Sequence, residues 1–570
     1  MFLSQFKAPA QQRVTVSKFG GYDARRRAPL GSFARMENLT GDGYPTLSVR
    51  EKRKTIAALD KPNGLAAKDS LIWVDGRTLY INGLAIDLAL TDGEKQLVSM
   101  GAYLLIWPDK KYVNTQNLSD RGSLENAIQT TGTVTYALCR ADGTEYEGYT
   151  TGAAAPASAE SGDLWLDTGS GAALLRYDGV MWQAVDDAAL KLSAAGIGTG
   201  FSAGDGVTLS GCTGAAADGT WTLLQCGDNA IVIGTVAAIE GEQTTAVTVR
   251  RYVPDMDFVV ECGNRLWGCK YGMVDGKAVN ELYCCALGDF KNWNRFLGIS
   301  TDAWAASVGS DGAWTGAANY LGYPTFFKEN VIHRIAISSV GAHQVTETVG
   351  RGVQSGSSKS LCVVNEVLYY KAREGVCAYD GSFPSAVGEA LGDVRYHNAV
   401  GGGCGGKYYL SMQDGANAWH LFCYDTARGL WHREDDLHAL CFTQMDGELY
   451  AIDAETKQLL AMHGSQGTPE AAVKWAAETG LIGYTTVEQK YVSRFNLRML
   501  LPKGAKADMY IQYDSDGVWH HCGHMVGVGT KSFLLPVRPR RCDHFRMRIE
   551  GEGDVRVYSF AKILETGSDV

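Results

Sequence analysis

The sequence lacks long apolar runs and sustained helical periodicity. No stretch of about 18 apolar residues occurs, so an apolar membrane-spanning helix is excluded. Residues 1–7 show no apolar core followed by a small-residue cleavage site, so we expect no secretory signal and synthesis in a cytoplasm. Because a long apolar pattern of helical period is hard to find anywhere in the chain, the sequence does not predict a helical core.

Paired cysteine motifs and an excess of positive charge are also missing. The 14 cysteines include no Cys-x-x-Cys pair, and several, such as Cys362, Cys377, Cys423 and Cys441, lie in apolar strand patterns, which favours buried thiols over disulfides. The formal net charge of -10 and pI near 5.6 oppose a general electrostatic attraction to phosphate. A DNA-binding module is therefore disfavoured, whereas an acidic surface suits a protein that lies beside DNA without adhering to it.

Glycine and aromatic residues are abundant, and they recur in short hairpin patterns. The chain has 68 glycines, 13 tryptophans and 27 tyrosines. An Asp-Gly or Asn turn followed by alternating apolar residues ending in Leu-Tyr or Leu-Trp predicts a β-hairpin. These patterns lie at residues 75–80, 264–268, 365–370 and 446–450. A spacing of roughly 40 to 50 residues between comparable units is that of four-stranded propeller blades.

Shifts in composition divide the chain into four parts. Residues 1–118 hold an N-terminal segment and the first propeller strands, and residues 119–250, rich in Ala, Gly and Thr, are predicted to be an inserted small β module. Hairpins resume over residues 251–468. Longer alternating strands over residues 469–570 predict a C-terminal β-sandwich. The predicted fold class is all-β: an interrupted β-propeller followed by a β-sandwich.

Two groups of polar residues invite a catalytic or metal-binding interpretation. The first comprises His520, His521, Cys522, His524, Cys542, Asp543 and His544. Their spacing fits no standard zinc pattern, so we favour exposed turn residues and a buried thiol. The second group is the run Glu434, Asp435 and Asp436, which resembles the paired catalytic carboxylates of glycosidases. Adjacent carboxylates on a strand point to opposite faces, so a solvated turn is favoured.

Glycine and arginine clusters give no stronger signal. The segment 401–406 resembles a phosphate-binding loop but lacks the following Lys-Ser/Thr and precedes a strand, so we interpret it as a flexible turn between blades. Residues 25–27 and 538–541 are arginine-rich, and we favour protein contacts for them. No catalytic, cofactor-binding or metal-binding residue is therefore assigned, and we expect no enzymatic activity and no cofactor.

Several strand-and-turn strings resemble one protein family. They lie at residues 326–332, 351–357, 368–370, 375–381, 407–411, 424–431, 475–480 and 545–549, with a similar start over residues 19–50. Over residues 15–118 and 250–570 the chain resembles tailed-bacteriophage β-propeller tail proteins, the tail nozzle or hub proteins also called packaged-DNA stabilisation proteins. The insertion departs from the family pattern, and its 162–165 hairpin looks like modules of phage fibre and tail-tip proteins.

The resemblance implies a structural virion protein. It implies a homo-oligomeric ring, six subunits by expectation, that contacts the phage adaptor or portal and the fibre or tail-tip proteins. Such a ring extends the tail channel and retains packaged DNA until ejection, with DNA passing without sequence-specific binding. We expect a place in the virion tail, after assembly in the host cytoplasm. A propeller's short strand edges suit a stiff ring closed by head-to-tail contacts.

Two alternatives remain open. A distal tail or fibre protein would bind host surface glycan by stacking Trp165, Trp182, Trp293, Trp304 and Trp314 on sugars, although tryptophan in a propeller is more often a blade-core residue. A polysaccharide depolymerase ranks third, because no acid/base pair emerges from the sequence.

Overall fold

The protein folds almost entirely into β-strands, which confirms the all-β prediction. A computed structural model describes residues 11–169, 172–214, 216–236, 241–483, 489–538 and 540–566. Within these ranges two short 3-10 helices, η1 (Ser358–Ser360) and η2 (Glu389–Leu391), are the only helices. In that part of the chain we find no helix with the length and apolarity to cross a bilayer. The opening residues 1–7 and Pro539 lie outside the described residues.

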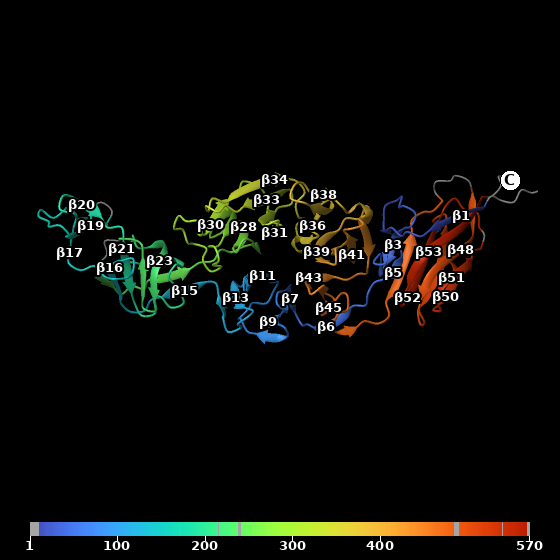
Figure 1. Cartoon of the computed structure of the whole chain (residues 1–570), viewed down its shortest axis with the longest axis horizontal. Coiled ribbons are helices and arrows are strands. Elements are labelled where there is room, and N and C mark those ends of the chain that lie inside the picture. Colours follow the sequence, from blue (N-terminus) through green and yellow to red (C-terminus); the bar gives the residue numbers. More distant parts are fainter. Residues whose placement is uncertain are drawn as a thin grey trace, which may run out of the picture. The chain divides into compact units, whose positions relative to one another are not determined.

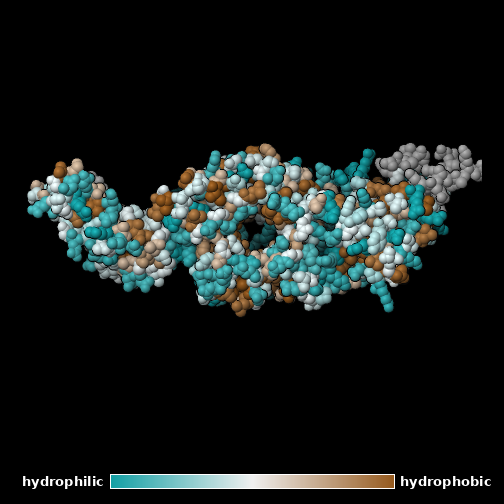
Figure 2. Space-filling model, viewed as in Figure 1, coloured by the Kyte–Doolittle hydropathy of each residue, from teal (hydrophilic) through white to brown (hydrophobic). Residues whose placement is uncertain are grey.

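The described residues form two compact bodies. The first draws on residues 1–94, 327–332 and 348–570, and the second on residues 95–326 and 333–347. Both bodies contain antiparallel four-stranded sheets of the propeller type, with strands joined in chain order (Figure 1). In the visible face of the space-filling view hydrophilic side chains predominate, and hydrophobic ones occur in small scattered groups (Figure 2).

Seven propeller sheets are present in the described part of the chain. Two lie in the second body, with β11 (Gln96–Met100), β12 (Tyr103–Trp107), β13 (Lys111–Asn114) and β14 (Arg121–Ser123) in one and β27 (Phe258–Glu261), β28 (Leu266–Val274), β29 (Lys277–Cys284) and β30 (Trp304–Ser307) in the other. A third sheet, mostly in the second body, consists of β31 (Gly316–Tyr320), β32 (Tyr323–Phe327), β33 (Val331–Ala336) and β34 (Gln344–Val349).

The other four propeller sheets belong to the first body. They are β7 (Pro62–Ala67), β8 (Leu71–Asp75), β9 (Thr78–Ile81) and β10 (Leu84–Ile86); β35 (Cys362–Val364), β36 (Val367–Ala372), β37 (Gly375–Tyr379) and β38 (Ser385–Ala386); β39 (His397–Cys404), β40 (Lys407–Gln413), β41 (Trp419–Asp425) and β42 (Leu430–Arg433); and β43 (Ala439–Met445), β44 (Glu448–Asp453), β45 (Gln458–Ala461) and β6 (Lys54–Ala58), with β46 (Thr468–Pro469) added to β6. The strand β6 comes from the N-terminal part of the chain and completes a sheet otherwise built some 400 residues later, antiparallel to β45.

The hairpin turns explain why these short sequences form sheets. Both central residues of the β43–β44 turn, Asp446 and Gly447, have positive φ angles of 51° and 78°. The β39–β40 turn has the same form at Gly405 and Gly406, with φ of 58° and 75°. Two-residue turns of this kind match the twist of the flanking strands, and Asp, Asn and Gly adopt them at low cost. The segment 401–406 is thus a strand end and a turn within one blade, which corrects the prediction of a flexible turn between blades.

Two further sheets lie in the second body, formed by the residues between β14 and β27. The first has eight strands: β15 (Asn126–Gln129), β16 (Val134–Arg140), β21 (Ala188–Ser193), β22 (Gly206–Ser210), β23 (Gly219–Gly227), β24 (Ala230–Ile233), β25 (Gly241–Gln243) and β26 (Thr248–Arg251). The second comprises β17 (Tyr149–Gly152), β18 (Leu164–Asp167), β19 (Ala173–Tyr177) and β20 (Trp182–Ala184). Leu190, Ile231 and Val249 are fully buried in the core of the larger sheet.

A β-sandwich completes the first body, and it is assembled from both ends of the chain. Its strands are β1 (Gln11–Val16), β2 (Gly21–Tyr22), β3 (Ser32–Glu37), β4 (Leu39–Thr40), β5 (Leu47–Val49), β47 (Lys474–Thr479), β48 (Lys490–Leu501), β49 (Lys506–Tyr513), β50 (His520–Val526), β51 (Gly529–Pro536), β52 (Phe545–Glu552) and β53 (Arg556–Thr566). Strands β1 and β5 pair with β53, and β3 pairs with β47. The short strand β2 pairs with β42, so one sandwich sheet continues into a propeller blade as a ten-stranded sheet.

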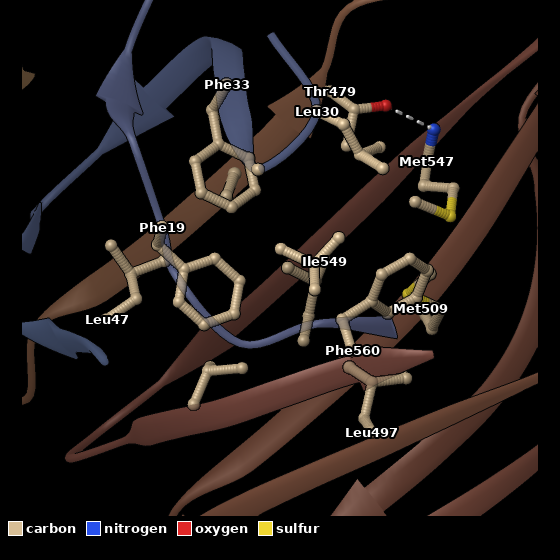
Figure 3. Close-up of a pocket in the computed structure, with 14 residues that line it drawn as sticks. Phe19, Leu30, Phe33, Leu47, Thr479, Leu497, Met509, Met547, Ile549 and Phe560 are labelled. Carbon is tan, nitrogen blue, oxygen red and sulfur yellow. Dashed lines mark hydrogen bonds between the residues drawn. The ribbon is translucent and has the colours of Figure 1, made fainter. Parts of the chain in front are cut away.

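The sandwich core shows this dual origin directly. Phe19 and Phe33 from the N-terminal segment face Met509, Ile549 and Phe560 from the C-terminal strands across a small apolar cavity of about 50 Å³ (Figure 3). A gap of this size, lined by apolar atoms, is a packing imperfection rather than a ligand site. Strands β1, β3 and β5 are therefore part of the sandwich, whereas the strands from β6 onward begin the propeller sheets.

Candidate functional site

The histidine-rich segment predicted as a turn lies in strand β50. His521 Nε2 and His524 Nδ1 each lie 2.9 Å from Asp508 Oδ1 on the neighbouring strand β49. Cys542 is buried elsewhere, with its Sγ 3.4 Å from the Lys490 carbonyl oxygen. Within the described ranges no group of three His, Cys, Asp or Glu side chains is arranged to hold a metal ion. His520, His521 and His524 are exposed and Cys542 is buried, as predicted, but the three histidines lie in a strand that pairs with β49 rather than in a turn.

The acidic segment after β42 is a buried ion cluster. Arg53 donates to Glu434 Oε2 at 2.7 Å and to Asp435 Oδ2 at 2.7 Å. Arg50 donates to Glu470 Oε1 at 2.5 Å, and its Nε lies 3.8 Å from Glu434. Burial opposes ionisation of Asp435, but the charge of Arg53 outweighs it and lowers the pKa of that carboxyl. The predicted solvated turn is therefore wrong for Glu434 and Asp435, which are committed to arginines rather than to a reacting bond, whereas Asp436 is exposed, as predicted.

The arginine-rich segments each contain a side chain that is held in place. Arg25 donates to Asp23 through Nη2 at 2.6 Å and through Nε at 2.9 Å. Arg540 donates to Asp516 at 3.1 Å, and its guanidinium lies 5.5 Å from the ring centre of Tyr513. The partner contacts expected of both segments stay a prediction.

Most of the tryptophans proposed for sugar stacking are core residues. Trp165, Trp293 and Trp314 are buried, which leaves Trp182 and Trp304 partly exposed. Trp304 packs its ring against Trp267 at 5.9 Å between centroids, and Trp182 packs against Trp165 at 5.5 Å. This set therefore offers no continuous stacking surface.

A different site emerges on the outer face of the sandwich sheet, over β3, β47, β52 and β49. We call it the sandwich cleft, and it has a volume of about 430 Å³. It is lined by Arg35, Glu37, Lys474, Trp475, Ala476, Glu478, Lys506, Asp508, Arg548, Glu550, Gly551 and Glu552. Neighbouring residues such as Ala477, Met509 and Ile549 point the other way into the core, as expected from strand alternation.

The cleft exists because short residues lie among long charged ones. Ala476 pairs with Glu550 across β47 and β52, and Glu550 pairs with Asp508 across β52 and β49. Ala476 and Gly551 form the floor, and Gly551 is required there, because an added Cβ would lie 2.3 Å from the Lys506 carbonyl oxygen. The longer charged side chains around this floor form the walls of the cleft.

Charges of both signs alternate around the floor. Arg548 Nη2 lies 2.8 Å from Glu550, and Lys506 Nζ lies 2.9 Å from Glu552. Burial tends to raise the pKa of Asp508, but hydrogen bonds with His521 and His524 outweigh it and lower that pKa. The cleft thus presents ionised acceptors beside cationic donors, an arrangement that suits a ligand with many hydroxyl groups.

Aromatic rings border the cleft. The Arg548 guanidinium lies 5.0 Å from the ring centre of Tyr510 and 5.1 Å from that of Trp519. Both rings are partly exposed. A guanidinium held over two rings is oriented by cation–π attraction, and the partly exposed rings add apolar surface at the rim of the cleft.

Sequence reasoning missed this cleft because its residues come from four strands. Alternate charges are visible along β49 (Lys506, Asp508) and β52 (Arg548, Glu550), and on their own they indicate a solvent-facing sheet side. The register that places Ala476 between them, by contrast, depends on long-range strand pairing.

Comparison with known proteins yields structural likenesses alone. No family model and no curated protein sequence matches the chain. The phage phi92 endosialidase is 10% identical, with a TM-score of 0.24, over 78% of this chain and 68% of its own. A glycoside hydrolase is 11% identical at a TM-score of 0.22 over 53% of this chain and 96% of its own. Trypanosoma rangeli sialidase is 10% identical at 0.22 over 98% of this chain and 96% of its own.

These likenesses correct one expectation from the sequence. The matching solved structures are named as glycoside hydrolases and sialidases, which are enzymes, so the expectation of a chain without enzymatic activity is withdrawn.

Proposed function

We propose that this protein binds glycans and that the sandwich cleft is the binding site. The observation that carries the proposal is the cleft's construction: a small-residue floor at Ala476 and Gly551, enclosed by alternating carboxylates and cations and bordered by exposed rings. Sugar hydroxyls both donate and accept hydrogen bonds, and sugar rings carry apolar faces that pack on aromatic side chains. Asp508 and Glu550 supply acceptors, Arg548 a donor, and Tyr510 a stacking face.

The cleft matches one or two sugar units in size. Small-molecule sites have volumes of roughly 300–1,000 Å³, and the cleft's 430 Å³ lies in the lower half of this range. Its open position on a sheet face leaves room for a longer chain to continue across β3 and β50. An internal segment of a polysaccharide can therefore be bound, as well as a chain end.

The test is a glycan array probed with the full-length protein, followed by calorimetry with the best ligand. Ala476→Trp fills the floor without changing charge and should abolish binding, and Asp508→Asn should weaken it at least tenfold. Arg498→Gln, an exposed change on β48 of the other sheet, is the matched control and should bind as the unmodified protein does. Binding that survives Ala476→Trp would refute the assignment to this cleft.

The same samples also report hydrolysis. Release of reducing ends from the bound polysaccharide would identify a depolymerase, and its loss in Ala476→Trp would place cleavage at the cleft. Binding without release leaves the protein as a glycan-recognising module.

The resemblance of the sequence to phage tail proteins supports a place in a virion tail for this glycan-binding chain. A tail component that binds a host surface glycan would act at attachment. Immunogold labelling of intact particles tests the location: label at the distal tail supports the proposal, and label confined to the head would contradict it. Closed rings of purified protein in negative stain would instead favour the nozzle function expected from the sequence.

A further inference from the structure

A second concave site, which we call the N-terminal pocket, lies in the first body where the segment 18–32 meets the beginning of β42. Its volume is about 290 Å³. Its lining includes Phe19, Gly20, Tyr22 and Asp23, then Arg25 of the first arginine-rich segment, and Gly429 with the first residues of β42, Leu430 and Trp431. The glycan-binding proposal above uses none of these residues.

Glycine at position 21 makes the tight approach in this region possible. Gly21 has a φ of 72°, and a Cβ added there would lie 2.3 Å from the Trp431 carbonyl oxygen. The N-terminal segment therefore lies directly against the propeller blade, and Tyr22 hydrogen-bonds through its backbone ladder to Trp431. The pocket walls are fixed by this sheet pairing rather than by a loose loop.

Arg25 is oriented at the pocket by a buried carboxylate. Asp23, whose side chain is 6% exposed, accepts bonds from Arg25 Nη2 at 2.6 Å and Nε at 2.9 Å, and from the Arg25 backbone N–H at 3.1 Å. The guanidinium is thus held by one edge, and its Nη1 remains at the surface, 3.9 Å from the highly exposed Glu389. An arginine fixed in this way is preorganised to bind a planar anion, because its side chain loses little conformational entropy when the anion binds.

The pocket is less acidic than the chain as a whole. Its charged lining residues are Lys18, Arg25 and Asp23, and Glu389 lies at its edge, 3.9 Å from Arg25 Nη1, so two cations stand beside two carboxylates in a chain of net charge -10. Asp23 is already bonded to Arg25, whereas the side chain of Glu389 is 76% exposed and its attraction to Arg25 is screened by solvent, so a ligand carboxylate can take its place.

The remaining wall suits a ring. Leu30 is 51% exposed and Tyr44 40% exposed, and the Tyr44 ring is held under the Arg428 guanidinium at 5.3 Å. Arg428 is in turn bonded to Asp425 at 2.6 Å. Apolar surface beside a fixed arginine matches a molecule that combines a ring with a carboxylate, and the volume limits it to about one sugar unit.

We propose that the N-terminal pocket binds a carboxylate-bearing sugar unit, with Arg25 contacting the carboxylate and Asp23 as the residue that positions Arg25. The ring packs against Tyr44 and Leu30, and Lys18 adds a second cation at the rim. This site is separate from the sandwich cleft, and either proposal can fail without the other.

Calorimetry of the full-length protein with D-glucuronate tests the proposal, with D-glucose as the neutral probe. We expect glucuronate to bind at least tenfold more tightly than glucose, and more weakly as salt is raised. Arg25→Gln should reduce glucuronate affinity at least tenfold, and Asp23→Asn several-fold. Arg26→Gln, an exposed neighbour that does not line the pocket, is the matched control and should leave affinity unchanged.

Further measurements test whether the ligand is a sugar acid rather than a simple anion. Tyr44→Ala, which alters an exposed ring and should not impair folding, should weaken glucuronate but leave inorganic phosphate unaffected. Ala476→Trp should leave glucuronate binding here unchanged, which separates this site from the sandwich cleft. The proposal is overturned if glucuronate does not bind, if Arg25→Gln and Arg26→Gln behave alike, or if phosphate or a hexaglutamate peptide binds as tightly as the sugar acid.

Discussion

Removal of Arg53 should destabilise the first body strongly. Its side chain is 7% exposed and bonds to Glu434 and Asp435, both held away from bulk water. Arg53→Gln would leave two partly or fully buried carboxylates without their main cation. Removing one partner of a buried ion pair costs about 3–5 kcal/mol, because the charge that remains is uncompensated. The nearby Arg50, 3.8 Å from Glu434, offsets part of this cost, so a loss near 3 kcal/mol is expected.

The effect should depend on pH in a defined direction. Burial raises the pKa of Asp435 and of Glu470, but their arginine partners outweigh it, so both pKa values are lowered in the folded protein. Carboxyls with lowered pKa values stabilise the fold above their unfolded pKa values, near 4, and this contribution is lost as the pH falls through the folded values. The deficit of Arg53→Gln should therefore be largest at neutral pH and should shrink in acid, where the carboxyls are protonated.

Urea unfolding followed by tryptophan fluorescence measures this loss at pH 7 and pH 4. Lys61→Gln, which removes the exposed ion pair with Asp92 at 3.0 Å, is the control and should leave the midpoint unchanged. Arg53→Met combined with Glu434→Leu should recover part of the stability, since matched apolar groups need no charge compensation. If Arg53→Gln unfolds no earlier than Lys61→Gln at pH 7, the cluster does not stabilise the fold as described.

Three smaller predictions concern the sandwich and the thiols. Gly527→Ala should destabilise the sandwich by about 1–3 kcal/mol in urea unfolding, because the added Cβ would lie 1.8 Å from the Pro502 carbonyl oxygen, and an unchanged midpoint would contradict this contact. Burial lowers the pKa of Lys562 to about 8, so Lys562→Met should stabilise the protein by about 3 kcal/mol at pH 7. This gain in stability should fade as the pH rises from 8 to 10.5, because the wild-type lysine then becomes neutral. A gain that does not change with pH would contradict a buried ammonium at this position. All 14 cysteines are present as thiols. In the native protein a thiol reagent should react quickly with no more than the four half-buried cysteines, Cys226, Cys362, Cys441 and Cys522. After denaturation it should react with all 14.

The sequence by itself determined the local β-structure. The Asp446-Gly447 pair requires two positive φ angles, and the alternation after it matches a half-buried strand, so a hairpin follows from a few neighbouring residues. The same reasoning identified the all-β fold class, because hairpins that recur roughly every 40 to 50 residues are typical of propeller blades, which are built from strands.

The tertiary structure alone decided which hairpins and strands meet. Strand β53 pairs with β1 from the opposite end of the chain, and β45 pairs with β6, although nothing in the strand period of either segment specifies a partner. The sequence alone favours a solvated turn at Glu434, yet in the folded chain Arg53, 381 residues away in sequence, donates a hydrogen bond to it. The apolar periodicity of a strand and the chemistry of a turn are set by a few neighbouring residues. Strands that are distant in sequence become neighbours only in the folded chain, and their pairing creates the burial, the charge pairs and the floor of the sandwich cleft.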